Sequence, residues 1–340
     1  MKKKNKKINM KRILIVLVVI AVIVAIPIRL SKKSNDVKGE VAENTVEQVL
    51  IENENTSIEN KENSELEQKL QSGKTLSETG LPVLMYHFFY DKSKETGKDG
   101  NWIEISNFEE QMKYLAENDF YFPTWEQVEN YIDGKQELPE KSVVITVDDG
   151  DPSFFELAVP IIQKYKIPTT SFVITYWYGN RANDKQDYVS YQSHSYDMHK
   201  AGSNGKGVML SWDYDKIKDD ILLSRDVLGG ANIFCYPFGQ YNDLDIKVLK
   251  ENGYKLAFTT KGGRVKKGSS KYELPRVRIS GNTGIEEFKK KVEWFLSKGP
   301  YHFAKRNGPN EKRNDHFAKI NGPNGKRNGP NTKNYIIFCT

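Results

Sequence analysis

The stretch Ser142–Asp151, with the sequence SVVITVDDGD, constrains the fold of this chain more than any other part of it. A run of β-branched residues leads directly into two adjacent acids and a glycine, which is typical of a strand buried on both faces of a sheet. In α/β folds the chemistry gathers where such strands end, and Asp148 and Asp149 stand at that point. Two neighbouring carboxylates repel each other unless a cation lies nearby. The alternative is that they only cap the following helix.

Strand-like and helix-like patterns alternate along the middle of the chain. The predicted strands cover 81–87, 120–123, 142–148, 169–175, 188–194, 232–236, 254–259 and 273–279. The predicted helices cover 108–115, 124–134, 154–165, 211–229, 243–252 and 285–296. Capping boxes, Ser106 with Glu109 and Thr124 with Gln127, are expected to begin the first two helices. Such alternation indicates βα units around a parallel sheet, and seven or eight strands indicate a barrel-like α/β arrangement.

Residues 1–30 have the pattern of an export signal. Residues 1–12 are mostly basic, and residues 13–28 are apolar apart from Pro27. Basic residues at both ends of the apolar run allow it to span a membrane, and the positive N-terminus keeps that end cytoplasmic. We interpret 1–30 as an uncleaved membrane anchor. This predicts a single-pass cell-membrane protein with its folded domain extracytoplasmic, or a secreted protein if the signal is cleaved.

Two further segments are too polar to form a core. Residues 31–80 are rich in Glu, Asn, Ser and Lys, which predicts a disordered linker, with a short helix near Glu65–Gln71 as an alternative. Residues 299–340 contain the near-repeats HFAKRNGPN and HFAKINGPN, which predict a disordered basic tail. The alternatives for the tail are binding to anionic wall polymers and metal binding by His302 and His316.

Charge and cysteine content narrow the function classes. Lys and Arg outnumber Asp and Glu by 51 to 45, and the excess is gathered at the two ends of the chain. This distribution is weak evidence for a nucleic-acid partner, and we expect none. Cys235 and Cys339 are the only cysteines, so the sequence predicts neither a disulfide framework nor a Cys-rich zinc site.

A pair of histidines, His194 and His199, follows the strand predicted downstream of the two acids. Five residues of helix turn by about 500°, so these histidines cannot share one helix face, but a loop at a strand end can direct both to one ion. With Asp149 they make a set of two histidines and one carboxylate that suits a divalent metal. Asp148 would then be the base that deprotonates a water molecule. The alternative is a solvated loop with one buried imidazole.

Two more features lie at later strand ends. The run Phe234–Asn242, FCYPFGQYN, combines aromatic side chains with a Pro-Phe-Gly turn. Aromatic walls suit sugar rings, and the backbone N–H groups of a turn can stabilise an oxyanion, although a packed turn is an equal alternative. Arg276, in Leu274-Pro-Arg, could pair with Asp148 and set its pKa, or pair with a surface acid.

Taken together, these motifs resemble the polysaccharide deacetylases, the NodB-homology group of carbohydrate esterase family four. The matching motifs are Met85-Tyr-His87, Thr146-Val-Asp-Asp-Gly150, His194-Ser-x-x-x-His199, Tyr236-Pro-Phe-Gly239 and Leu274-Pro-Arg276. They occur in the family's order over residues 81–297, so we place the deacetylase domain at 81–298. The resemblance implies a distorted (β/α) barrel of about seven strands.

The resemblance also implies residue roles. Asp148 matches the catalytic base, and Phe238 matches the position whose backbone N–H binds the oxyanion. Tyr236 and Pro237, which precede it, are assigned to the same substrate or oxyanion site. The matching metal ligands are Asp149, His194 and His199. The implied cofactor is a divalent metal, zinc first, with cobalt or nickel as alternatives. The implied partner is an extracellular or cell-wall polysaccharide that contains N-acetylglucosamine, and the implied reaction is hydrolysis of its N-acetyl groups to acetate.

Three departures from the family pattern refine these expectations. The histidine spacing matches the branch that acts on poly-β-1,6-N-acetylglucosamine, which we favour over peptidoglycan or chitin oligomers. The arginine often found before the Pro-Tyr-Gly turn is Cys235 here, so Arg276 is the candidate substitute. The late Leu-x-His motif is not visible, which leaves His87 as the candidate general acid. The alternative functions are an O-acetyl polysaccharide esterase and a non-catalytic polysaccharide-binding homologue.

Overall fold

The structure is a computed structural model that describes residues 61–71, 73–76, 79–202 and 205–293. The predicted anchor (1–30), the first part of the predicted linker and the predicted tail (299–340) lie outside the described residues. Within those residues, no helix is both long enough and apolar enough to cross a membrane.

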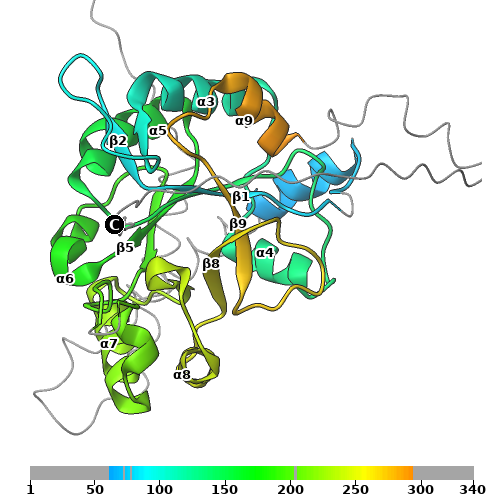
Figure 1. Ribbon diagram of the computed structural model, residues 1–340. Coiled ribbons are helices and arrows are strands. Elements are labelled where there is room, and N and C mark those ends of the chain that lie inside the picture. Colours follow the sequence, from blue (N-terminus) through cyan, green and yellow to red (C-terminus); the bar gives the residue numbers. More distant parts are fainter. Residues whose placement is uncertain (1–60, 72, 77–78, 203–204, 294–340) are drawn as a thin grey trace, which may run out of the picture. The chain divides into compact units, whose positions relative to one another are not determined.

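Seven parallel strands of the described chain close into a ring (Figure 1). In their order around the ring they are β1 (Val83–Tyr86), β4 (Val144–Val147), β5 (Thr169–Val173), β6 (Val189–Ser193), β7 (Ile233–Cys235), β8 (Leu256–Gly262) and β9 (Leu274–Arg278). The ring closes because β1 pairs with β4 on one side and with β9 on the other. A parallel α/β fold of about seven strands was the expectation from sequence, and it is confirmed.

Helices connect most of the strands and lie outside the ring (Figure 1). They are α3 (Ile105–Glu117), α4 (Trp125–Ile132), α5 (Val159–Tyr165), α6 (Thr175–Tyr178), α7 (Tyr214–Val227), α8 (Asp243–Glu251) and α9 (Ile285–Val292). Shorter helical turns are η2 (Phe154–Ala158), η3 (Gly179–Asn183), η4 (Val208–Ser211) and η5 (Pro237–Gly239). A second, two-stranded parallel sheet pairs β2 (Phe88–Tyr90) with β3 (Trp102–Glu104), where the sequence suggested only a polar loop.

Alternate residues of β1 and β4 face two separate cores, because successive side chains of a strand point to opposite faces. Leu84 and Ile145 belong to the cluster that packs against α3, α5 and α9. Their neighbours Val83 and Val144 belong to a second cluster, together with Phe172 of β5 and residues of β7, β8 and β9. All four residues of β4 are buried, as the continuous apolar run predicted.

The folded unit includes residues that the sequence placed in the disordered linker. Residues 61–71 are helical, and Leu66 is only 2% exposed in the same cluster as Val83. Leu76 is buried there as well. The linker prediction for 31–80 is therefore wrong in its last part. Two well-placed leucines are enough to dock this segment, although its composition is strongly polar.

Helix starts follow the predicted capping in one case and not in another. Thr124 and Gln127 form the predicted capping box of α4. The predicted box of Ser106 with Glu109 is wrong, because α3 begins earlier and its cap is Glu104, whose carboxylate accepts the Ser106 N–H. Glu109 pairs instead with Lys164. The strand predicted at 120–123 is reduced to a single bridge.

Candidate active site

The ends of neighbouring parallel strands bring the predicted site residues together. Val147, the last residue of β4, pairs with Tyr86 of β1 and with Ser171 of β5. His87 and Asp148 are the next residues of their chains, so they leave adjacent strands at the same edge of the ring. Further round the ring, Val173 of β5 pairs with Ser193 of β6, and His194 follows Ser193. Sequence-distant residues therefore meet at one edge because every strand of the ring runs in the same direction.

Asp149, His194 and His199 converge on one point. The distance from Asp149 Oδ1 is 3.4 Å to His194 Nε2 and 3.5 Å to His199 Nε2. Among the described residues, this buried carboxylate oxygen has no hydrogen-bond partner. A buried oxygen left without a donor, and faced by two imidazole nitrogens, is the donor set that a divalent cation requires. These three residues therefore fit the metal site that the sequence predicted.

The ring orientation of His194 suits metal binding. His194 Nδ1 lies 2.8 Å from the carbonyl oxygen of Cys235, which can only accept a hydrogen bond. A neutral ring that donates from Nδ1 presents the lone pair of Nε2, the atom that faces Asp149. Burial, with His194 as a neighbour, lowers the pKa of His199 to about 4, so the His199 imidazole is neutral near pH 7. Against the effect of burial, Cys235 and Asp149 raise the pKa of His194 well above its ordinary value, so a cation at its Nε2 would have to displace a proton.

Asp148 is held by a buried arginine. Arg276 Nη1 donates to Asp148 Oδ1 and Nη2 donates to Oδ2, both at 2.7 Å. Each residue is 1% exposed. Burial alone would raise the pKa of Asp148, but the guanidinium outweighs it and holds this pKa well below its usual range. Of the two alternatives for Arg276, the structure therefore shows the pairing with Asp148.

Further contacts fix the guanidinium itself. Arg276 Nε donates to the carbonyl of Thr259 at 3.0 Å, and Nη1 also donates to Thr146 Oγ1 at 3.1 Å. Cys235 Sγ lies 3.1 Å from Arg276 Nη2 and 3.6 Å from Asp148 Oδ2. Asp148, His194 and Cys235 could also surround an ion, but Arg276 already occupies both oxygens of Asp148. The set built on Asp149 is therefore the better metal site.

His87 lies beside the same carboxylate. Its Nε2 is 3.7 Å from Asp148 Oδ2, which is longer than a hydrogen bond. Burial lowers the pKa of His87 below its ordinary value despite the neighbouring acids, so the imidazole is neutral near pH 7. The structure thus brings His87 to the site, and its role as general acid remains a prediction.

The turn Tyr236–Gly239 reaches the site through Phe238. The Phe238 ring centroid lies 4.3 Å from that of His199, and its backbone has a left-handed φ of 58°. Gly239 packs so closely on Thr260 that a Cβ atom would collide with it. Tyr236 and Pro237 are buried, and the Tyr236 hydroxyl donates to the carbonyl of Tyr272. The turn therefore places Phe238 beside His199, while the side chain of Tyr236 belongs to the core.

Comparison with known proteins agrees with this geometry. The polysaccharide deacetylase family model matches residues 135–257. A poly-beta-1,6-N-acetyl-D-glucosamine N-deacetylase of Staphylococcus aureus (strain MRSA252) is 30% identical over 230 residues, which cover 62% of this chain and 78% of that protein. The chain belongs to the polysaccharide deacetylase family. The enzyme of the same name from Staphylococcus epidermidis is 28% identical over 212 residues, or 57% of this chain and 73% of that one.

Solved structures of deacetylases share the fold. The Streptococcus pyogenes deacetylase PplD, in complex with acetate, superimposes with a TM-score of 0.56 at 23% identity and covers 64% of this chain and all of its own. IcaB from Ammonifex degensii has a TM-score of 0.53 at 24% identity, over 65% of this chain and 99% of its own. The ring of strands in this deacetylase is therefore an arrangement that proteins of distant sequence also adopt.

Exposed aromatic residues next to the deacetylase site were missed in the sequence. Tyr176 and Trp177 of α6 are 58% and 49% exposed. The Trp177 ring lies 6.3 Å from that of His199, and the Tyr176 ring lies 5.5 Å from that of Tyr196. The signal in the sequence was the Tyr-Trp-Tyr run immediately after a predicted strand, in a segment that was interpreted only as a loop. These rings are apolar surfaces beside the loop that carries His199.

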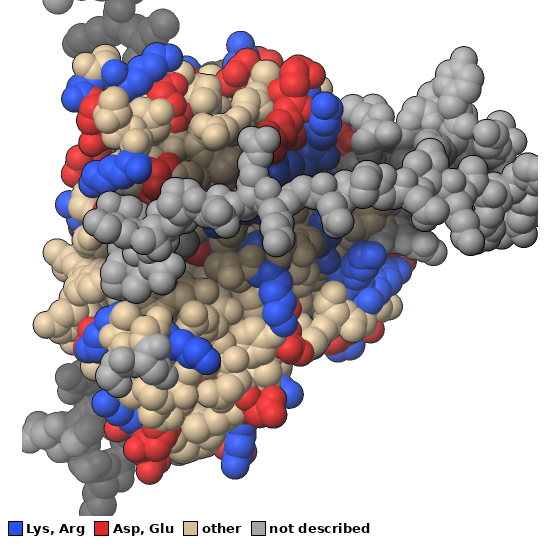
Figure 2. Space-filling view, viewed as in Figure 1, with Lys and Arg blue, Asp and Glu red and all other residues tan. Residues whose placement is uncertain are grey.

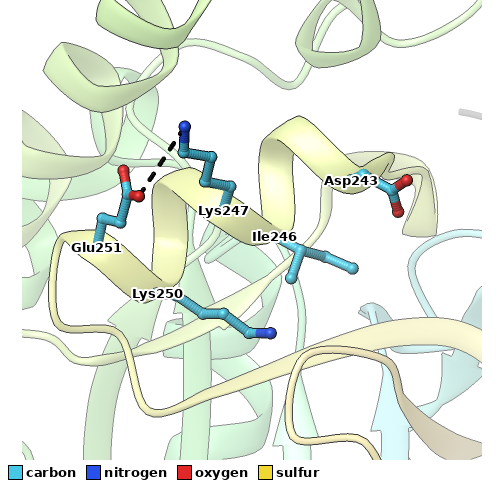
Figure 3. A pocket seen from close by; sticks show the side chains of 5 residues that line it. All are labelled: Asp243, Ile246, Lys247, Lys250 and Glu251. Carbon is cyan, nitrogen blue, oxygen red and sulfur yellow. Dashed lines mark ion pairs between the residues drawn. The ribbon is translucent and has the colours of Figure 1, made fainter.

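Two surface hollows were found on the described part of this deacetylase. One, of about 390 Å³, lies along α8 and is shown in Figure 3. Its lining residues are Asp243, Ile246, Lys247, Lys250 and Glu251, and none of them belongs to the Asp/His site. The other, of about 460 Å³, is lined by Gly239, Gln240 and Tyr241 with Lys206, Leu210 and Lys261. Only the second adjoins the turn that carries Phe238.

Charges on the visible face of the deacetylase are mixed. Outside the area covered by grey atoms, Lys and Arg side chains alternate with Asp and Glu side chains in Figure 2. Among the described residues, opposite charges form ion pairs such as Lys267 with Glu137 and Lys271 with Asp133. The excess of basic residues in the whole chain thus does not form one continuous basic surface on this face.

Proposed function

We propose that this polysaccharide deacetylase hydrolyses N-acetyl groups of a poly-β-1,6-N-acetylglucosamine polymer and releases acetate. The observation that carries the proposal is that the two adjacent acids after β4 have different surroundings. Asp149 joins two histidines in an open three-ligand set, while Asp148, next to it, is held ionised by Arg276. The relatives named as deacetylases of this polymer support the choice of substrate.

The residues support a specific sequence of proton transfers. A divalent cation held by Asp149, His194 and His199 would polarise the acetamide carbonyl and make a water molecule more acidic. Asp148 accepts a proton from the water that attacks the carbonyl carbon. The N–H of Phe238 donates to the oxygen that becomes negative. As the C–N bond breaks, the amine nitrogen gains a proton and acetate is released. His87 is the proposed donor: it is neutral beforehand, takes the proton that Asp148 accepted from the water, and passes it to the amine.

The aromatic residues beside the site suit a sugar polymer. Apolar faces of sugar rings stack on exposed aromatic side chains, and Trp177 is both exposed and close to His199. We place against the Trp177 ring the sugar residue that neighbours the one whose N-acetyl group is cleaved. The freed amine makes the product cationic, which would change how the polymer adheres to anionic surfaces.

The proposal extends to metal identity and location. Zinc is the first choice for a site with two histidines and one carboxylate, with cobalt or nickel as substitutes. The basic and apolar residues at 1–30 support a membrane anchor with the deacetylase domain extracytoplasmic, next to extracellular or cell-wall polysaccharide. Fractionation of cells that make the full chain, followed by protease treatment of intact cells, tests this location. Protection of the domain inside intact cells would contradict it.

An acetate-release assay tests the activity. The purified protein, loaded with zinc, cobalt or nickel, is incubated with poly-β-1,6-N-acetylglucosamine, peptidoglycan and chitin oligomers, with and without chelator. We expect release from the β-1,6 polymer that the chelator abolishes. Release only from an O-acetylated polymer such as acetylated xylan would favour the esterase alternative. Polymer binding without acetate release under any metal would favour the non-catalytic one.

A further inference from the structure

The segment between the two metal-site histidines, His194–His199, is a loop held from two sides. From α6, the N–H groups of Thr175 and Tyr176 donate to the carbonyls of Ser195 and Tyr196, at 3.1 and 3.0 Å. The second support comes from a residue that no sequence motif singled out, Asp220 of α7. The loop conformation is therefore imposed by its neighbours on both sides.

Asp220 uses both carboxylate oxygens on consecutive amides of the loop. Its Oδ1 accepts the N–H of Tyr196 at 2.7 Å, and its Oδ2 accepts the N–H of Asp197 at 2.8 Å. Asp220 is 7% exposed, and no Lys or Arg among the described residues forms an ion pair with it. A buried carboxylate is costly without a cation, and here two backbone N–H groups offset that cost. A fold that needed only packing at this position would be served better by an apolar residue.

The loop needs such a clamp because its conformation is not a regular one. Ser195 has a left-handed φ of 73°, a conformation that is unfavourable for a residue other than glycine. Its hydroxyl accepts the N–H of Met198 at 3.1 Å, which bends the chain back toward the site. His194 has its own ring hydrogen bond to Cys235, whereas His199 follows Asp197 by two residues and depends on the loop backbone. Small changes in that backbone move His199 Nε2 relative to Asp149.

We propose that Asp220 is a positioning residue for metal binding. By fixing the amides of Tyr196 and Asp197, it sets the loop so that His194 and His199 present their Nε2 atoms to the same point as Asp149. The proposal rests on the assignment of those three residues as the metal ligands. It assigns to Asp220 no contact with the substrate or with the metal.

The test compares Asp220→Asn with Asp219→Asn. Asp219 precedes Asp220 on α7 but is exposed, so its variant makes the same change of charge without touching the loop. Both variants and the wild type are stripped of metal and titrated with Co²⁺, which reports affinity and coordination through its absorption spectrum. We expect Asp220→Asn to bind Co²⁺ about 10- to 100-fold more weakly, the usual effect of losing a residue that orients ligands, and with an altered spectrum. Asp219→Asn should match the wild type.

Amide hydrogen exchange of the metal-free proteins provides a second readout. The amides of Tyr196 and Asp197 should exchange faster in Asp220→Asn than in the wild type or in Asp219→Asn. If Asp220→Asn does not fold, Asp220→Glu serves instead, because it keeps the carboxylate but displaces it by one methylene. Wild-type Co²⁺ affinity and spectrum in either folded variant would overturn the proposal.

The outcome is separable from that of the proposed function. Metal binding and amide exchange are measured without polymer, so a protein that binds Co²⁺ but releases no acetate would refute the deacetylase proposal and leave this one standing. His199→Ala checks the assignment of the ligands. Unchanged Co²⁺ affinity in that variant would remove the basis on which Asp220 is assigned its role.

Discussion

The two halves of the site, built on adjacent residues, are held in different ways. Asp148 is fixed by side chains, chiefly the two-point contact with Arg276 of β9, which only β1 separates from β4 in the ring. The metal half is fixed through the backbone, by α6 and by Asp220 on the loop that carries His199. A buried counter-charge faces Asp148, whereas carbonyls and amides of the His194–His199 loop are occupied by hydrogen bonds. Substitutions in the two halves should therefore have different effects on metal content, activity and stability.

The largest effect is expected from removal of the metal. Asp149→Ala removes the carboxylate that both histidines face, so metal content and acetate release should both be lost. Elemental analysis of the purified variant checks the first, and the acetate assay checks the second. Added zinc should restore acetate release by the chelator-treated wild type but not by the variant. A variant that keeps its metal would contradict the assignment of Asp149 as a metal ligand.

Asp148→Asn should lose activity while the metal stays. The amide cannot accept the proton of the attacking water, and general-base catalysis contributes about 100- to 10,000-fold to a rate. We expect acetate release to fall by that factor at unchanged metal content. The measurement is kcat on the β-1,6 polymer beside elemental analysis of the same sample. Retained kcat would show that Asp148 is not the base.

Arg276→Met should destabilise the fold as well as slow the reaction. It leaves Asp148 as a buried charge without a partner, a change that costs about 3–5 kcal/mol in other proteins. Urea unfolding at pH 7 measures the loss. Cys235→Ser, which changes a neighbour of the same pair but not its charge, is the matched control and should cost much less. Equal losses in the two variants would indicate a packing role for Arg276 rather than a charge role.

The pH dependence of stability should reflect the ion pair between Asp148 and Arg276. Because the pKa of Asp148 is lowered in the folded protein, its ionised form stabilises the fold above its unfolded pKa of about 4. This stabilisation begins to be lost as the pH falls through that value and continues to fall until the pH passes the lower folded-state pKa, at a slope of at most about 1.4 kcal/mol per pH unit. Urea unfolding from pH 6 to pH 3 should show a steeper loss for the wild type than for Asp148→Asn. Parallel curves would contradict the lowered pKa.

The smallest effect is expected at the aromatic surface. Trp177→Ala removes a stacking surface worth about 0.5–1.5 kcal/mol, so KM for the polymer should rise about 2- to 12-fold with little change in kcat. Tyr188→Ala is the control, because Tyr188 is also exposed but precedes β6, at the end of the strand away from His194. A fall in kcat without a change in KM would mean that Trp177 positions His199 rather than the sugar.

Much of the fold was readable from the sequence because strand ends and helix periods are local signals. The strand before Asp148 and Asp149 was predicted within two residues of its observed bounds. The sequence missed β2 and β3, whose short aromatic runs flank a polar loop. The helix at 61–71 was offered only as an alternative, near Glu65–Gln71, because one fully buried leucine, Leu66, does not produce a strong apolar pattern.

The chemistry of the site was largely determined by the sequence, and its support by the tertiary structure. Residue types and spacing alone indicated two acids with different roles and two histidines for one ion. Only the closed ring decided that Arg276 reaches Asp148, because no local pattern relates residues that are 128 positions apart. Asp220 is the clearest case, since an acid on an amphipathic helix looks like a solvent-exposed charge. The carboxylate lies against the loop amides only because α7 packs beside β6 in the folded ring.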